Sequence, residues 1–184
     1  MTLYRCLAWN ERARVDGPDG PLWFPRPFQG DGRHDNPDVY GCLYLSTDPL
    51  ACVTEQLAAF RGQRLIASML RRRNLPLALA TITVAEAARF VDLGDPIVLA
   101  REGLRPSRVA TMDRAITQPL ARTLFTRHRR ASGLTWWSTW EAQWINVTLF
   151  DRAAAALSLL NVESLTLEHP TVQAAAERFG LRAV

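Results

Sequence analysis

Residues 39–62, which read VYGCLYLSTDPLACVTEQLAAFRG, predict a strand followed directly by a helix. Side chains alternate in character along residues 39–46, so the leucines point to one side of the expected strand and Tyr44 to the other. Asp48 and Pro49 predict the start of the helix, because aspartate caps the first amides and proline fits the first helical position. This strand and helix fix the centre of the fold.

Glu55 lies on an unusual face of the predicted helix, which we expect to end at Gly62. An apolar stripe at helical spacing is formed by Leu50, Val53, Leu57 and Phe60. Glu55 falls nearly opposite, among the small residues Ala51, Cys52, Ala58 and Ala59. A carboxylate there is either a surface charge or the wall of a cleft with room for a ligand, and the small apolar neighbours favour the cleft.

The remaining sequence predicts alternating helices and strands in one domain over residues 1–184. A long Gly-, Pro- and Asp-rich loop spans residues 16–36 and ends at Gly32-Arg33-His34. We expect helices at residues 65–73, 119–131, 152–160 and 170–179, and extended segments at residues 77–84, 90–96, 134–140, 145–150 and 162–167.

Residues 134–140 alternate, which places Trp136 and Ser138 on the same face of the expected strand. Four of the six tryptophans lie between Trp136 and Trp144. Tryptophan clusters usually belong to a core or an interface, so the presence of Ser138 among them is what makes this segment a candidate site.

Composition excludes several classes of protein. No apolar run is long enough for a membrane span, and the N-terminal residues lack the pattern of an export signal. Three cysteines without C-x-x-C spacing indicate reduced thiols in a cytoplasmic protein, neither a disulfide framework nor a metal site. The net charge of +4 comes entirely from arginine. Residues 71–73, the densest arginine cluster, are expected to form a solvated helix end that complements the helix dipole.

Arg33, Tyr44 and Glu55 recur at equal intervals of eleven residues, and Ser138 follows far downstream. This ordered set resembles the RES family, which is named for an Arg, a Glu and a Ser. The similarity covers most of the chain, from residues 3–5 to residues 146–150, although His34 replaces an aromatic residue and Trp137 a proline. The resemblance implies a compact α+β domain with mixed or antiparallel sheets flanked by helices, related in architecture to ADP-ribosyltransferases.

RES proteins are toxins of bacterial toxin–antitoxin pairs that act on NAD, so the resemblance implies NAD as a substrate, with no further cofactor and no metal. Cleavage of the nicotinamide–ribose bond requires negative charge near the ribose and a fixed pyrophosphate. Arg33 suits the pyrophosphate, Arg5 a second phosphate or a ribose, and Glu55 the developing cation. The other candidates, for stacking or for hydrogen bonds to the ribose, are Tyr44, Trp136 and Ser138.

Three functions follow from these residues. NAD breakdown by water or phosphate ranks first, and ADP-ribosyl transfer to a protein ranks second. A basic nucleic-acid-binding domain ranks third, because the arginines are scattered and no recognition motif is present. The resemblance also implies a helix-turn-helix (Xre-type) antitoxin as partner. From the composition and the absent motifs, we expect this chain to bind neither a membrane nor a nucleic acid directly.

Overall fold

The computed structural model describes residues 1–181 and divides the chain into two compact units. The first unit contains residues 1–23, 45–84 and the segment from residue 158 onward, and the second contains residues 24–44 and 85–157. The chain therefore passes repeatedly from one unit to the other, and one of these passages falls inside β2 (Cys42–Ser46). The structure contains helices and a mixed sheet, which confirms the predicted α+β fold class. Within the described residues, no helix is long and apolar enough to cross a membrane.

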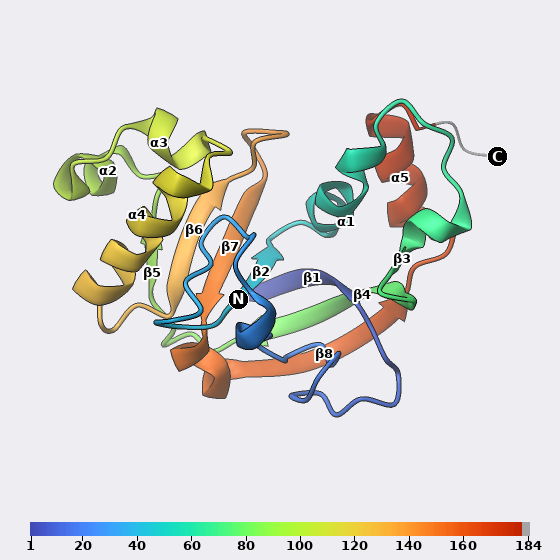
Figure 1. The fold of residues 1–184 in the computed structure, drawn as a ribbon, viewed down its shortest axis with the longest axis horizontal. Helices are drawn as coiled ribbons and strands as arrows, with labels where there is room; N and C mark the ends of the chain where they lie inside the picture. Colours follow the sequence, from blue (N-terminus) through green and yellow to red (C-terminus); the bar gives the residue numbers. More distant parts are fainter. Residues whose placement is uncertain (182–184) are drawn as a thin grey trace. The chain divides into compact units, whose positions relative to one another are not determined.

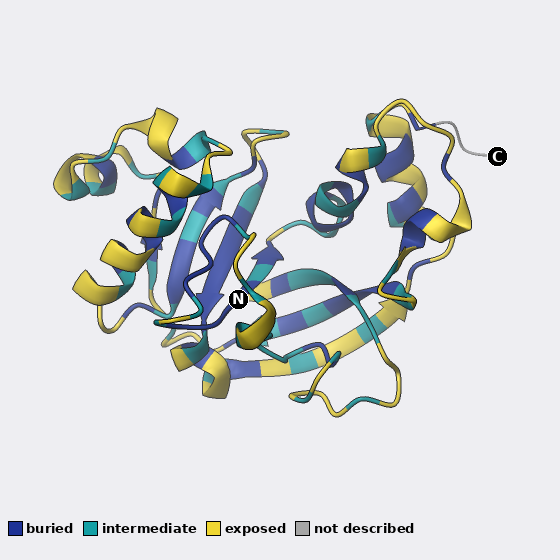
Figure 2. Ribbon diagram, in the orientation of Figure 1, coloured by how far each residue is buried: buried dark blue, intermediate teal, exposed yellow. Residues whose placement is uncertain are grey.

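The first unit is built on antiparallel strands. Its strands are β1 (Thr2–Ala8), β3 (Arg71–Arg72), β4 (Leu75–Val84) and β8 (Leu157–Ser164), together with the end of β2. The neighbour order is β3-β4-β1-β2, and β8 also pairs with β4. β1 and β4 are in register from Thr2↔Thr83 to Ala8↔Leu77. β4 is the more deeply buried of the two: residues 77–80 are buried in succession, followed by Ile82 and Val84, and Figure 2 shows buried and intermediate residues along this strand.

Helices α1 (Pro49–Leu57) and α5 (Pro170–Arg178) share one apolar cluster in this unit (Figure 1). The side chain of Asp48 accepts a hydrogen bond of 2.7 Å from the amide of Leu50, which confirms the predicted cap. A short 3₁₀ turn (Ala58–Phe60) follows α1, and Gly62 then takes a positive φ of 78°. Both faces of α1 carry buried residues.

Two predicted helices are wrong, one in the first unit and one that spans the boundary between the units in the chain. Residues 65–73 form a 3₁₀ turn (Ala67–Leu70) and then strand β3, which turns into β4 through Arg73 and Asn74. Both of these residues have positive φ, as a two-residue hairpin turn requires, so the arginine cluster marks a hairpin and not a helix end. Residues 152–160 are a 3₁₀ segment (Asp151–Ala156) followed by the start of β8, because pairing with β4 outweighs the helical preference of the alanines.

The second unit packs helices on a small mixed sheet. β5 (Phe90–Asp92) is parallel to β6 (Gly133–Trp137), which is antiparallel to β7 (Ile145–Phe150). The helices are α2 (Pro96–Glu102), α3 (Pro106–Ala110) and α4 (Arg114–Arg127), and a 3₁₀ turn spans Arg26–Phe28. Figure 1 shows α4 running beside β5 and β6. Leu120, Ala121 and Leu124 are its buried face.

α4 begins five residues earlier than its predicted start at Pro119. The carboxylate of Asp113 accepts a hydrogen bond of 2.9 Å from the amide of Ala115 and so caps the helix. Pro119 lies inside the helix, where it has no amide to donate. The prediction places the helix start at Pro119 and does not take account of Asp113, which is the residue that caps the helix.

Candidate functional site

The loop that carries Arg33 is held by a buried carboxylate. Asp35 is 5% exposed, and its Oδ2 accepts hydrogen bonds from the amides of Gly30 (2.8 Å) and Gly32 (2.7 Å). Its Oδ1 accepts from the hydroxyl of Tyr44 at 2.7 Å. A Cβ at position 32 would lie 2.5 Å from both Asp35 Oδ1 and the Tyr44 hydroxyl oxygen, so a side chain there would have to displace one of these two groups.

Arg33 is 7% exposed and its guanidinium is fixed by protein groups. The Nη1 atom donates to the carbonyl oxygen of Val109 at 2.9 Å and to that of Thr111. The guanidinium carbon lies 4.5 Å from the ring centroid of Trp136, in cation–π geometry. Arg33 is therefore oriented by the end of α3 and by β6, and carries a fixed positive charge in the second unit.

Tyr44 is half-buried on β2, and its hydroxyl is engaged on both sides. It donates to Asp35 Oδ1 and accepts a hydrogen bond of 2.8 Å from the amide of His34. Burial, and then the neighbouring Cys42 and Asp35, raise the pKa of Tyr44 well above its usual value. Tyr44 is thus a neutral phenol whose proton points at a carboxylate.

His34 follows Arg33 and is almost fully buried. Its Nδ1 lies 2.8 Å from Thr148 Oγ1, which also accepts a hydrogen bond of 3.2 Å from the indole nitrogen of Trp136. Its ring packs edge-on against Trp136 at 5.4 Å between centroids. Burial, followed by the charges of Arg33 and Arg114, lowers the pKa of His34 to about 3. His34 is consequently a neutral packing residue at neutral pH.

Ser138 immediately follows β6 and is 2% exposed. Its amide donates to the carbonyl of Trp144 at 2.8 Å, and its Oγ accepts from the amide of Trp140 at 3.1 Å. The alternation predicted for residues 134–140 holds as far as Ser138, whereas Trp140 is exposed. Ser138 therefore lies in a closed turn beside the Trp136 strand.

Arg5 and Glu55 belong to the first unit. The Nη1 atom of Arg5 donates to the carbonyl oxygen of Pro21 at 2.6 Å, with longer bonds to those of Gly20 and Trp23. Glu55 is half-buried on α1, one turn after Cys52. Burial raises the pKa of Cys52 to about 12, and the charge of Glu55 adds to the shift while that of Arg5 opposes it. Glu55 and Arg5 thus both act on the electrostatics around the α1 thiol.

Comparison with known proteins identifies the family of this chain. A family model described as RES domain matches residues 2–171. The chain belongs to the RES-domain family. Its fold is similar to a chain of the crystal structure of the M. tuberculosis MbcT–MbcA toxin–antitoxin complex, with a TM-score of 0.65 and 21% identity over 96% of this chain and 87% of that chain. No curated protein sequence matches the chain.

Within this RES domain, the second unit brings together Arg33, Tyr44 and Trp136, with Ser138 at the end of the same strand as Trp136. Sequence reasoning missed the residues that support them, which are Asp35, Asn36, Gln118 and Thr148. Asn36 and Gln118 tie the loop to α4: the amide of Gln118 donates to the carbonyl oxygens of Gly30 and Gly32 at 2.7 and 2.9 Å. The one available signal was the polar run that follows Arg33.

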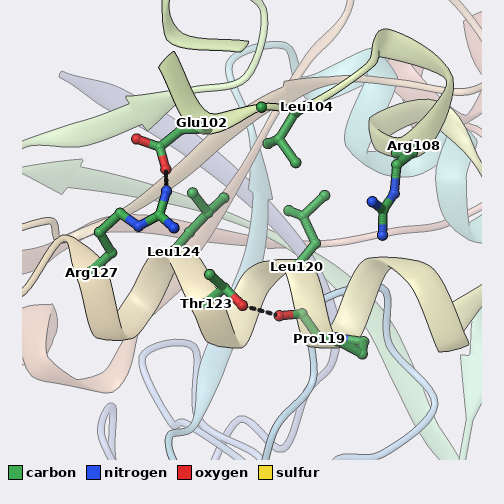
Figure 3. A pocket seen from close by; sticks show the side chains of 9 residues that line it. Glu102, Leu104, Arg108, Pro119, Leu120, Thr123, Leu124 and Arg127 are labelled. Atoms are coloured by element: carbon green, nitrogen blue, oxygen red, sulfur yellow. Dashed lines mark hydrogen bonds and ion pairs between the residues drawn. The ribbon is translucent and has the colours of Figure 1, made fainter. Parts of the chain in front are cut away.

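A separate hollow of about 230 Å³ lies against α4 in the same unit (Figure 3). Leu104, Leu120 and Leu124 contribute apolar side chains, and Arg108 and Arg127 lie on either side of them. The only carboxylate in its lining is Glu102, which pairs with Arg127 at 2.6 Å and with His128 at 3.0 Å. None of the candidate residues lines this hollow. Within residues 1–181, no group of His, Cys, Asp and Glu is arranged to hold a metal ion.

Proposed function

We propose that this RES protein is the toxin of a toxin–antitoxin pair and breaks NAD at the bond between nicotinamide and ribose. The observation that carries the proposal is the RES match over residues 2–171, a range that contains all six candidate residues. The fold likeness to a chain from a toxin–antitoxin complex supports the toxin role. NAD enters as the substrate, and the proposal includes no further cofactor and no metal.

In the proposed reaction, the bond between the ribose C1′ and the nicotinamide nitrogen breaks heterolytically. The electron pair goes to the ring nitrogen, so nicotinamide leaves as a neutral molecule and positive charge develops on the ribose. The oxygen of phosphate or water then bonds to C1′, and an attacking water releases one proton to the solvent. We assign stabilisation of the developing charge to Glu55, because a carboxylate near the cation acts mainly in the transition state.

The proposal also gives each candidate residue a binding role. We assign the pyrophosphate to Arg33, whose charge is oriented before the substrate arrives. Tyr44 contributes the face of its ring to stacking, because its hydroxyl is already paired with Asp35 and His34. Arg5 is assigned to a second phosphate or ribose, Ser138 to the nicotinamide ribose or the acceptor, and Trp136 to stacking.

Product analysis tests the proposal. The purified protein is incubated with NAD in phosphate buffer and in phosphate-free buffer, and proton NMR measures free nicotinamide and the sugar product. We expect nicotinamide release by the wild type and by Glu177→Gln, a control at an exposed position on α5, and none by Glu55→Gln. Absence of nicotinamide from the wild-type reaction would overturn NAD cleavage.

The same experiment separates the acceptors. A phosphorylated or free ADP-ribose product supports NAD breakdown, and loss of product in phosphate-free buffer identifies phosphate as the acceptor. If nicotinamide appears while ADP-ribose stays attached to added cell proteins, the enzyme is an ADP-ribosyltransferase. We further propose a cytoplasmic protein whose partner is a helix-turn-helix (Xre-type) antitoxin, because an active NAD-consuming enzyme must be blocked in its own cell.

A further inference from the structure

We propose that Asp35 is the positioning residue of this site, and that its buried carboxylate fixes the loop carrying Arg33, together with the Tyr44 ring, before the substrate binds. The reaction that Asp35 serves rests on the function proposed above. The fixing of the loop does not, because it is visible in the protein without substrate.

The carboxylate of Asp35 joins two segments of the second unit. Oδ2 binds the loop through the amides of Gly30 and Gly32, and Oδ1 binds β2 through the Tyr44 hydroxyl and, at 3.4 Å, the thiol of Cys42. All four partners are donors, and only a carboxylate offers enough acceptor positions on both oxygens with no hydrogen of its own. Bonds to an ionised acceptor are also stronger than those between neutral groups.

The backbone on either side of Arg33 is held by this arrangement. The amide of Gly32, one residue before Arg33, donates to Asp35, and the amide of His34, one residue after it, donates to the Tyr44 hydroxyl. The Tyr44 hydroxyl in turn donates to Asp35. Arg33 therefore projects from a backbone that Asp35 anchors directly on one side and through Tyr44 on the other.

The close packing at Gly32 gives independent support. Asp35 Oδ1 and the Tyr44 hydroxyl oxygen approach the Gly32 backbone so closely that a methyl group would lie 2.5 Å from each. The loop thus has one tight position relative to the carboxylate. Groups that hold the substrate equally in the ground state and the transition state affect KM more than kcat. Loss of this positioning should accordingly raise KM and leave kcat nearly unchanged.

Steady-state kinetics with NAD test the role. The variants are Asp35→Asn, Tyr44→Phe and the double variant, with Asp31→Asn as the control because Asp31 is an exposed aspartate of the same loop. We expect Asp35→Asn to raise KM about tenfold with kcat within about threefold, since the charged hydrogen bonds that it removes are worth about that much. Because the Tyr44 hydroxyl links Asp35 to the His34 amide, we expect the double variant to raise KM by less than the product of the two single effects.

A merely structural role gives a different result. Partial unfolding lowers the number of active molecules, so it lowers the apparent kcat and leaves KM unchanged. An Asp35→Asn enzyme whose KM stays within twofold of the Asp31→Asn control overturns the proposal. If Asp35→Asn does not fold, the Tyr44→Phe variant is the test. It keeps the Asp35 carboxylate and removes the hydrogen bond from the Tyr44 hydroxyl. An unchanged KM of Tyr44→Phe then overturns the proposal.

Amide hydrogen exchange without NAD keeps the two proposals apart. We expect Asp35→Asn to speed exchange at Gly30 and Gly32 at least tenfold, and Asp31→Asn to leave both unchanged. Unchanged exchange at both glycines in Asp35→Asn overturns the role of Asp35 whatever the activity. A further outcome is that the wild type releases no nicotinamide while Asp35→Asn still exchanges faster at the two glycines. That result supports the fixing of the loop by Asp35 and rejects only the proposed reaction.

Discussion

Arg33 and Glu55 differ in how the protein holds them. Arg33 is buried, stacked on Trp136 and bonded to backbone carbonyls of the second unit, whereas Glu55 is half-buried on a helix of the first unit. A fixed guanidinium is suited to binding an anion, because little conformational freedom is lost when the anion arrives. Substitutions of the two residues should consequently change different parameters.

Glu55→Gln should abolish NAD cleavage while leaving the fold intact. The substitution keeps the size of the side chain and removes a charge that acts on the developing cation. We expect kcat to fall by roughly 10²–10³, the range found when one preorganised electrostatic contact is lost. Nicotinamide release and a thermal melt of the purified variant measure the two effects. Wild-type turnover by Glu55→Gln would exclude Glu55 from catalysis.

Arg33→Ala should weaken NAD binding and also lower stability. The pyrophosphate loses a charged donor, while the carbonyl oxygens of Val109 and Thr111 lose theirs, at a cost of about 1–3 kcal/mol. Arg33→Lys should restore part of the affinity, because lysine keeps the charge without the planar fork. Calorimetry on a Glu55→Gln background measures affinity without turnover. Lower stability with unchanged affinity would exclude Arg33 from the phosphate site and leave Arg5 as the candidate.

His34 should make the protein less stable in mild acid. Its pKa is about 3 in the folded chain, against about 6.5 when unfolded, so below pH 6.5 the unfolded state binds more protons. The contribution of His34 is complete above pH 6.5 and is lost as the pH falls toward 3, by at most about 1.4 kcal/mol per pH unit. Denaturant unfolding at several pH values should show a shallower dependence for His34→Phe. An identical slope in the two proteins would contradict this assignment.

At the scale of elements, the C-terminal end of α4 depends on a residue outside the helix. Arg152 donates to the carbonyl oxygens of Phe125 at 2.9 Å and Arg129 at 2.6 Å, and its guanidinium lies 3.4 Å from the centroid of the Phe125 ring. The last carbonyls of a helix lack partners within the helix, and a cation there also complements the helix dipole. Arg152 therefore fixes α4, whose other end is capped by Asp113.

Arg152→Met should destabilise the protein by about 1–3 kcal/mol, because the aliphatic stem remains while the charged donors to α4 are lost. Chemical denaturation monitored by tryptophan fluorescence provides the measurement. The matched control is Arg130→Met, which removes an exposed arginine just beyond the same helix end and should change stability by less than about 0.5 kcal/mol. Equal effects of the two substitutions would show that Arg152 does not cap the helix.

At the scale of the whole molecule, the proposed function predicts toxicity. Expression of this chain alone in a bacterium should halt growth and lower cellular NAD, whereas Glu55→Gln should be harmless at the same level of soluble protein. Co-expression of the helix-turn-helix partner should restore growth, because a bound partner blocks access of NAD. Growth curves and NAD assays provide the readout. Normal growth with soluble wild-type protein would argue against the toxin role.

Local signals in the sequence predicted much of the fold. Asp48 and Pro49 placed the start of α1, which ends at Leu57 and continues as a 3₁₀ turn to Phe60, short of the predicted end at Gly62. β4, β7 and α5 agree with their predicted ranges to within two residues. These signals work because a cap, a turn or an alternating strand depends on residues that are neighbours in the chain. The ordered set of Arg33, Tyr44, Glu55 and Ser138 likewise identified the family, since order along the chain needs no coordinates.

Contacts between distant residues were decided only by the tertiary structure. Residues 152–160 have a helical composition, yet pairing with β4 draws the end of this segment into β8. The role of Asp35 exists only because the loop at Gly32 and the strand at Tyr44 fold onto one carboxylate. The sequence by itself determined the start of α1, the ranges of β4, β7 and α5, the family and the candidate residues. Folding decided which side chains are buried and which donors meet each acceptor, because both depend on segments that are far apart in the chain.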